Sequence, residues 1–113
     1  MIVYPRVHAD IDLDAIRHNM DEMHRLTDPH TKLMAVIKTD GYGHGAIPIA
    51  RELEPIEYVY GYAVATEEEA LALRADGIKK PILILGYTFP EQYEALLQAQ
   101  ITPAIFTMEA AKL

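Results

Sequence analysis

The feature of this sequence that most constrains its fold is a regular alternation of short apolar runs with segments that favour helices. Apolar runs at 33–37, 58–65, 81–85 and 102–106 are each followed by residues with helix-starting signals. The runs begin roughly every 20 to 26 residues, which is typical of βα repetition. Their nearly continuous apolar character is typical of strands in a parallel sheet covered on both faces. Two architectures satisfy this pattern: a doubly wound sheet and a (β/α)8 barrel.

Start and stop signals indicate where the helices lie. Asp12 is a good N-cap residue, and apolar side chains then recur at helical spacing at Leu13, Ile16, Met20 and Met23. Thr66 is followed three residues later by Glu69, the pattern of a capping box, and Gly77 is placed to end that helix. A further helix, opened by a proline, is predicted over residues 90–98.

The length of the chain limits how much of either architecture it holds. A complete (β/α)8 barrel takes about 250 residues, whereas this sequence has 113. The predicted fold class is therefore α/β, a partial (β/α)8 TIM barrel of about the first half. The sequence also stops within a predicted helix start, so we expect it to be the opening part of a longer protein.

Composition excludes several classes of protein. A net charge of −7 argues against a nucleic-acid surface, which needs clustered Lys and Arg. The absence of cysteine excludes disulfides and thiolate metal sites. No apolar run approaches the ~20 residues that a membrane helix needs, and no signal-peptide pattern is present. We expect a soluble cytoplasmic protein without a nucleic-acid or membrane partner.

The most specific chemical signal is the lysine that ends the first apolar run. A buried ammonium is costly unless the site uses it, and an imine with pyridoxal phosphate is such a use. Side chains alternate along a strand, so Met34, Val36 and Lys38 are predicted to share one face. Lys38 would then stand at the C-terminal end of its strand, where barrel active sites lie. A solvated lysine at a strand end is the competing interpretation.

The turn that follows favours the interpretation as a binding site. Gly41, Gly43 and Gly45 permit positive φ and a close approach of the backbone to a ligand. Tyr42 offers a hydroxyl that can bind a phosphate. The turn leads into a predicted helix N-terminus, which is a natural place for an anion. For His44, within the same turn, stabilisation of the turn is favoured over proton transfer.

Other polar and aromatic groups have simpler explanations. His18 is four residues from Asp14 and from Glu22, but the three fit a solvated helix face better than a metal site, and no metal ligands are predicted. Tyrosines alternate along the second apolar run, at positions 58, 60 and 62. A stacking platform for bases would need a basic surface, so packing under helices is the better interpretation.

The residues around the lysine resemble a known signature. Ala35-Val36-Ile37-Lys38 followed by Tyr42-Gly43-His44-Gly45 resembles the pyridoxal-phosphate attachment site of alanine racemases. The resemblance extends from about Val7 to the end of the chain, with supporting matches at 9–16, 64–74 and 77–86. The lysine motif is highly specific, and the other segments are supportive.

The resemblance implies a fold-type III pyridoxal 5'-phosphate enzyme: an N-terminal barrel, a separate β domain and a homodimer. Residues 1–113 would be the N-terminal portion of the barrel, the rest of the barrel and the β domain lying outside this chain. Lys38 would carry the cofactor as an imine and act as the base on one face of the substrate carbon. Tyr42 would contact the cofactor phosphate, and Leu85 would pack near its ring.

The family's opposite-face tyrosine, its arginine facing the pyridine nitrogen and most of its phosphate contacts lie later than this chain extends. Thr39-Asp40-Gly41 differs from the residues more common in the family, at positions that need turn geometry more than chemistry. The resemblance therefore implies racemisation of L- and D-alanine for cell-wall D-alanine supply, by two-base proton transfer. The chain alone is expected to be inactive, because it supplies only one of the two bases.

Three alternatives remain open at this stage. One is a serine-preferring racemase, which the same segment would serve. The second is a non-catalytic carrier of pyridoxal phosphate on the same barrel, from which the Tyr42-Gly43-His44-Gly45 turn is not expected. The third is a small α/β interaction module without a cofactor, in which Lys38 is only a surface lysine.

Overall fold

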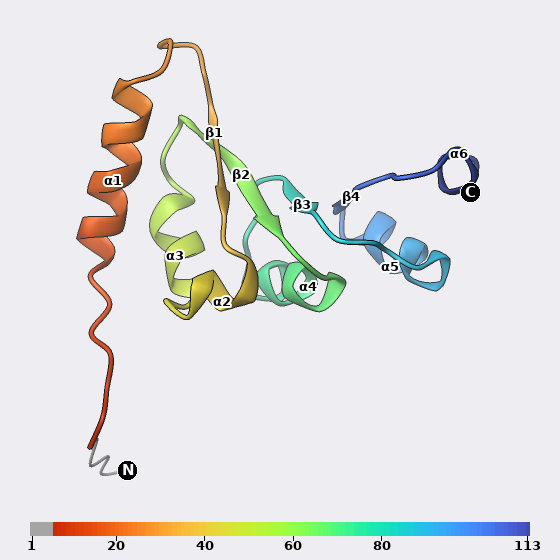
Figure 1. Cartoon of the computed structure of the whole chain (residues 1–113), viewed down its shortest axis with the longest axis horizontal. Coiled ribbons are helices and arrows are strands. Elements are labelled where there is room, and N and C mark those ends of the chain that lie inside the picture. Colours follow the sequence, from red (N-terminus) through yellow and green to blue (C-terminus); the bar gives the residue numbers. More distant parts are fainter. Residues whose placement is uncertain (1–5) are drawn as a thin grey trace.

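A single parallel sheet organises the chain, and the computed structural model describes residues 6–113 of it. The sheet has four strands in the order β1-β2-β3-β4, and each strand is parallel to its neighbours (Figure 1). The strands are β1 (Leu33–Val36), β2 (Val59–Val64), β3 (Ile82–Ile84) and β4 (Thr102–Pro103). Strand order follows chain order without a reversal, so the structure confirms a partial barrel rather than a doubly wound sheet.

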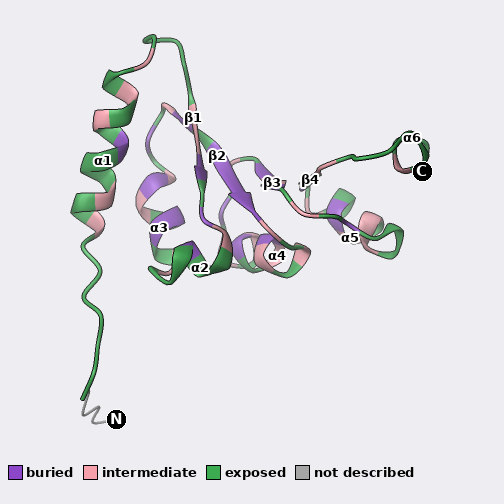
Figure 2. Cartoon of the chain, viewed as in Figure 1, coloured by how far each residue is buried: buried purple, intermediate pink, exposed green. Residues whose placement is uncertain are grey.

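The helices alternate with the strands along the chain, as predicted, with one helix before the first strand and one after the last. They are α1 (Leu13–Arg25), α3 (Ala46–Leu53), α4 (Glu67–Ala75), α5 (Tyr93–Gln98) and α6 (Met108–Ala111), with a 3-10 turn η1 (Pro90–Gln92) before α5. A short turn labelled α2 (Lys38–Tyr42) follows β1. Buried residues are concentrated on β2 and on the sides of α3 and α4 that face it (Figure 2).

The predicted capping residues begin their helices. The Asp12 carboxylate accepts a hydrogen bond from Ala15 N at 3.0 Å, and the Thr66 hydroxyl accepts one from Glu69 N at 3.3 Å. At the other end of α4, Gly77 has φ 94°, and the N–H of Ile78 bonds to the carbonyl of Leu73 at 3.1 Å. This is the Schellman arrangement, which needs a residue that tolerates positive φ.

The two faces of the sheet differ sharply in burial. Tyr62 of β2 pairs with Ala35 and Ile82 of the neighbouring strands, and all three are buried on the side of the helices. On the other face, Val36 is 44% exposed and Leu85 is 41% exposed, whereas the small side chain of Ala63 between their strands is buried. In a closed barrel that other face is the interior.

The three tyrosines of the second apolar run do not share a face, which corrects the prediction that all of them pack under helices. Leu33 pairs with Val59 but Met34 pairs with Gly61, so the register shifts by one residue at Tyr60. A bulge of this kind reverses the alternation. Tyr60 is consequently 51% exposed, whereas Tyr62 is fully buried.

Tyr62 and its neighbour Tyr58 are held by polar partners. The Tyr62 hydroxyl lies 3.0 Å from Ala50 O and 2.9 Å from a carboxylate oxygen of Glu54. Burial, together with the bond to Glu54, raises the pKa of Tyr62. Tyr58 stacks on His24 with ring centroids 4.1 Å apart, and burial and its bond to Asp21 raise its pKa to about 12. Both phenols are therefore neutral hydrogen-bond donors at physiological pH.

Basic side chains tie the N-terminal ends of the strands together. Arg74 donates to four carbonyl oxygens at 2.8 to 2.9 Å, those of Ile78, Lys80, Ala99 and Gln100. The Lys80 ammonium donates to two carbonyl oxygens just before and at the start of β2, those of Ile56 and Val59. Burial lowers the pKa of both cations. These bonds lie at the end of the sheet opposite Lys38.

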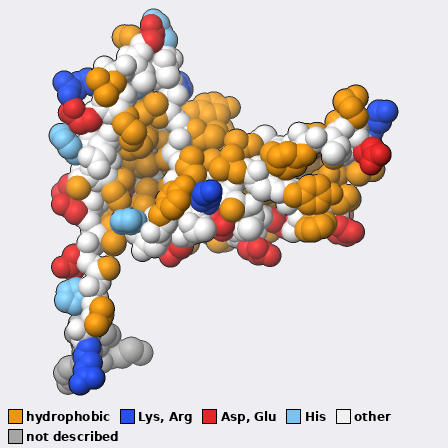
Figure 3. Space-filling model, in the orientation of Figure 1, with side chains coloured by type: hydrophobic (Ala, Val, Ile, Leu, Met, Phe, Trp, Pro, Cys, Tyr) orange, Lys and Arg blue, Asp and Glu red, His pale blue; other side chains and the backbone are white. Residues whose placement is uncertain are grey.

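The described chain exposes more surface than a closed domain of its size. Its accessible surface is 7975 Å², whereas a monomeric protein of this mass exposes about 6,200 Å². Its radius of gyration is 16.0 Å, against about 13 Å for a closed domain of this length. Hydrophobic side chains lie on the surface beside α1 and again at the α5–α6 end (Figure 3).

The fourth strand is shorter than predicted. The apolar run at 102–106 indicated five residues, but pairing covers only Thr102 and Pro103. Pro103 has no N–H to donate, so it weakens the strand as a template for further pairing. Within residues 6–113, no helix has the length and apolar character needed to cross a membrane.

Candidate active site

Lys38 is the first residue beyond the β1 ladder. The last ladder bond runs from Ile37 N to Ala63 O at 2.9 Å, and Ile37 itself has already left the extended conformation (φ −123°, ψ 28°). The two-residue alternation of β1 therefore does not by itself fix the face of Lys38. The lysine is half-buried, at the C-terminal end of the parallel strands.

The backbone after Lys38 makes a left-handed turn. Thr39, Asp40 and Gly41 have φ/ψ near 51/48°, 54/47° and 64/36°, and Tyr42 has φ 57°. For residues with a Cβ, this conformation costs roughly 1–2 kcal/mol each, and for a β-branched threonine it is an outlier. The sequence predicted positive φ only at the glycines, so the strain at Thr39, Asp40 and Tyr42 is a finding of the structure.

Hydrogen bonds from several directions hold this turn. The Asp40 carboxylate accepts from Ala46 N at 2.9 Å, and the Asp40 carbonyl accepts from Gly45 N at 2.8 Å. His44 Nδ1 lies 3.1 Å from the carbonyl of Gly41, which confirms that His44 stabilises the turn. The Thr39 N–H donates to the Glu69 carboxylate at 3.1 Å.

The helix N-terminus after the turn is already occupied by an anion from the chain itself. Gly45 is the N-cap of α3 and provides no side-chain bond. The Asp40 carboxylate instead takes the first free N–H of the helix, that of Ala46. This modifies the expectation of an anion site there, because one N–H and part of the favourable dipole are used internally.

Glycine suits position 41 because φ is +64° there and the backbone packs closely on α3. A Cβ at this position would lie 2.8 Å from Ile49 Cδ1 and 3.3 Å from Ala46 N. The turn thus packs directly on the first turns of α3. This close contact sets the position of the turn after Lys38 relative to α3.

The amine of Lys38 differs from that of Lys80. Among residues 6–113, the hydrogen bonds at Lys38 involve its backbone carbonyl, which accepts from the Thr39 hydroxyl at 2.7 Å, and not its Nζ. Lys80, by contrast, gives its Nζ to two carbonyl oxygens. Of these two lysines, Lys38 has the amine that is available to a ligand.

The other two predicted site residues lie at the same end of the sheet but apart from Lys38. Leu85 continues the β3 ladder, its N–H bonding to Val64 O at 2.8 Å. It is two strands away from Lys38, about 10 Å at the usual strand spacing. Tyr42 lines a hollow of about 410 Å³ beside β1, together with Met20 and Met23 of α1.

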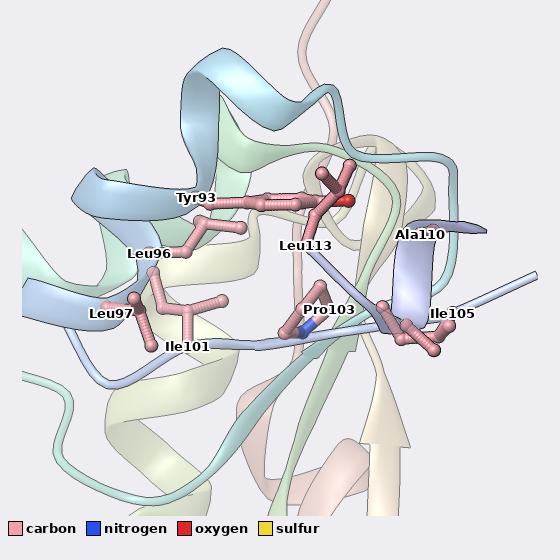
Figure 4. A pocket seen from close by; sticks show the side chains of 9 residues that line it. Tyr93, Leu96, Leu97, Ile101, Pro103, Ile105, Ala110 and Leu113 are labelled. Carbon is pink, nitrogen blue, oxygen red and sulfur yellow. The ribbon is translucent and has the colours of Figure 1, made fainter. Parts of the chain in front are cut away.

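The described residues do not close one pocket around Lys38, Tyr42 and Leu85. Neither Lys38 nor Leu85 lines the hollow beside β1. A second hollow, of about 450 Å³, lies at the opposite edge of the sheet and is lined by apolar side chains of α5, β4 and the C-terminal residues, such as Leu96, Ile101 and Leu113 (Figure 4). Within residues 6–113, no group of three or more His, Asp and Glu could hold a metal ion.

Sequential parallel strands alternating with helices place the chain among (β/α)8-barrel proteins, and an available lysine amine lies at the C-terminal rim of its strands. Residues 11–113 match the family model described as alanine racemase, N-terminal domain. The chain therefore belongs to the alanine racemase N-terminal domain family.

Individual relatives agree with this assignment. The chain is 45% identical over 109 residues to alanine racemase 2 of Oceanobacillus iheyensis, which covers 96% of this chain and 28% of the relative. It is 47% identical over 112 residues to the alanine racemase of Desulfovibrio desulfuricans, covering 98% of this chain and 30% of the relative. The chain thus spans less than a third of the length of these curated relatives.

Solved structures match as well. Alanine racemase of Clostridium difficile 630, in complex with cycloserine, superposes with a TM-score of 0.86 at 40% identity, over 90% of this chain and 27% of that one. The Bacillus anthracis alanine racemase with bound L-Ala-P superposes with a TM-score of 0.83 at 32% identity, over 90% of this chain and 26% of that one.

Two residues of the site escaped sequence reasoning. Asp40 was expected at a position that needs turn geometry more than chemistry, and the structure adds that its carboxylate caps α3. Glu69 was expected to close a capping box with Thr66, but its Oε2 bonds to Thr39, 30 residues earlier. The capping pattern assigned Glu69 a role within its own helix. A single sequence carries no signal for a hydrogen bond to a residue of another βα unit.

Proposed function

We propose that this chain is the cofactor-binding N-terminal part of a pyridoxal 5'-phosphate-dependent alanine racemase, which interconverts L- and D-alanine for cell-wall synthesis. The observation that carries the proposal is the free amine of Lys38, at the C-terminal rim of the barrel strands and directly before a strained, tightly held turn. Strain held in place by its surroundings is typical of functional sites. Membership of the alanine racemase family supports the choice of reaction.

The residues present fit the cofactor. An aldehyde needs an unengaged amine, and among residues 6–113 the hydrogen bonds leave Lys38 Nζ available. Tyr42 is 59% exposed, so its hydroxyl can donate to the phosphate, and the exposed side chain of Leu85 offers an apolar contact to the ring. The bound cofactor would act as the electron sink for the substrate carbanion. Lys38 would hold the cofactor and move the proton at the substrate Cα on one face.

A reduction experiment tests this assignment. After incubation with pyridoxal phosphate and borohydride, we expect the phosphopyridoxyl adduct at Lys38, located by peptide mass spectrometry. Lys38→Ala should remove the adduct, whereas Lys79→Ala, at an exposed lysine before β3, should retain it. A chain without an adduct at Lys38 would favour the α/β interaction module without a cofactor. An adduct in a longer protein that racemises neither alanine nor serine would indicate the non-catalytic carrier.

The isolated 113-residue chain is expected to have no racemase activity. Racemisation needs two opposed acid–base groups, one to remove the proton and one to return it on the other face. The proposed site supplies Lys38 alone, and the second group, a tyrosine, is proposed to lie later in the protein and to act from a partner subunit. The measurement is D-alanine formed from L-alanine, with a full-length relative as positive control. Conversion by this chain above the buffer rate would contradict the proposed division of the site.

Self-association is also expected. Both edge strands of the sheet, β1 and β4, carry backbone groups without a neighbouring strand among residues 6–113, and open edges invite pairing with another copy. Apolar hollows flank both edges. Light scattering after size exclusion should give a mass above that of one chain. A monomer that persists at high protein concentration would refute the prediction.

A further inference from the structure

We propose that Glu69 is a positioning residue for Lys38: its carboxylate fixes the backbone immediately after the lysine and so orients the amine. The inference rests on the proposed function, since it assigns a role within the same site. Glu69 lies on α4, behind the neighbouring strand β2, and reaches 30 residues back in the chain to the N–H of Thr39.

The N–H of Thr39 needs a partner that the turn does not supply. It follows the last ladder bond of β1, which Ile37 makes. The carbonyl of Ile37 accepts instead from Gly41 N at 2.9 Å, as the turn closes. An N–H in a first helical turn is otherwise left to side chains or water. A carboxylate acceptor makes this bond charge-assisted, about twice as strong as a neutral one.

The strain of the turn indicates why such a bond is needed here. Thr39 is β-branched and lies at φ 51°, a conformation that persists only where the surroundings enforce it. The Asp40 and His44 bonds act within the segment 40–46, and the Thr39 carbonyl accepts from Gly43 N at 3.2 Å, so the Thr39 N–H is the group that Glu69 holds. Glu69 therefore ties the Thr39 N–H of this turn to the next βα unit. Loss of the link frees the residue bonded directly to Lys38.

Glu69 can be changed without removing the start of α4. The helix is capped by the Thr66 hydroxyl, which accepts from the backbone N–H of Glu69 and not from its side chain. The Glu69 carboxylate lies 3.5 Å from that hydroxyl through Oε1, while Oε2 is the atom on Thr39. The capping bond remains available in Glu69→Ala and Glu69→Gln. Glu68, its exposed neighbour on the same helix turn, offers a matched control.

Two measurements on the full chain test the inference. The first is the rate of adduct formation at Lys38 with pyridoxal phosphate, trapped by borohydride at timed intervals. Glu69→Ala should lower this rate about tenfold, since small misplacements of a reacting group are costly. Glu69→Gln keeps an acceptor oxygen and should recover most of the rate, and Glu68→Ala should match the wild type.

The second measurement does not depend on the cofactor. Amide hydrogen exchange at Thr39 should be protected in the wild type and in Glu68→Ala, and should accelerate at least tenfold in Glu69→Ala. Unchanged exchange in Glu69→Ala, or equal adduct rates in Glu69→Ala and the wild type, would overturn the inference. If the wild type forms no adduct at Lys38, the proposed function fails, and the Glu69–Thr39 link is then judged from the exchange data alone.

Discussion

Replacing Gly61 by alanine is expected to destabilise the folded chain strongly. A Cβ at position 61 would lie 2.1 Å from the carbonyl oxygen of Pro81 and 2.9 Å from its carbonyl carbon. Both are backbone atoms of the segment entering β3, so no side chain can rotate away. The same segment takes part in the β2–β3 ladder, because the carbonyl oxygen of Pro81 accepts a hydrogen bond from Tyr62 N at 2.9 Å.

The expected loss exceeds about 4 kcal/mol, a large part of the roughly 5–15 kcal/mol by which domains are stable. Far-UV circular dichroism with urea titration measures it. Gly77→Ala is the matched control: a Cβ there meets nothing within 4 Å, and only the positive φ of 94° opposes it. That conformational cost is about 1 kcal/mol. Equal unfolding free energies of Gly61→Ala and Gly77→Ala would show that β2 and the segment before β3 can move apart at little cost in stability.

Replacing Arg74 by methionine is expected to cost about 3–5 kcal/mol of unfolding free energy. Methionine retains apolar volume but leaves four carbonyl oxygens without their donor, those of Ile78, Lys80, Ala99 and Gln100. Three of the four bonds are partly buried, so water replaces them incompletely. Lysine should not rescue the position, because one ammonium cannot reach all four acceptors from a single point.

Urea unfolding followed by circular dichroism gives the comparison. The control is Arg51→Met, which removes an exposed bridge to Asp76 between α3 and the end of α4. That arginine makes no carbonyl bonds to neighbouring loops among residues 6–113, and its loss should leave the unfolding midpoint nearly unchanged. An Arg74→Met midpoint that equals the Arg51→Met midpoint would contradict a role for Arg74 in tying the loops.

Sequence patterns predicted the structural features that depend on interactions between residues close together in the chain. Asp12 and Thr66 cap their helices through bonds three residues long, and Gly77 ends α4 through its own backbone freedom. These signals act within one turn of chain and can be read from one sequence. The parallel strands were likewise predicted, since continuous apolar runs fit a sheet packed against helices.

Features with distant causes were not predictable in the same way. The bulge at Tyr60 depends on how β1 and β2 align, and it moves that side chain to the opposite face from Tyr62. Thr39 and Asp40 are left-handed in a turn whose hydrogen bonds reach Glu69 and Ala46, and these partners cannot be recognised from the sequence alone. Propensity gives a weak prior that tertiary contacts override.

The sequence predicted where the candidate site lies, but the described residues do not bring its three predicted residues together. Lys38 lies at the strand end where the pattern placed it. Tyr42 and Leu85 lie at the same end of the sheet, yet the hollow that Tyr42 lines includes neither Lys38 nor Leu85. A site at a barrel mouth draws its walls from several strand ends, and the four strands present give walls on one side only.

The polar bonds among the loops entering the strands lie at the end of the sheet opposite Lys38. Arg74, Lys80 and Glu54 clamp the loops that enter the strands, whereas the exit side carries Lys38 and its turn. Substitutions at the exit side therefore leave the bonds that join the entering loops in place.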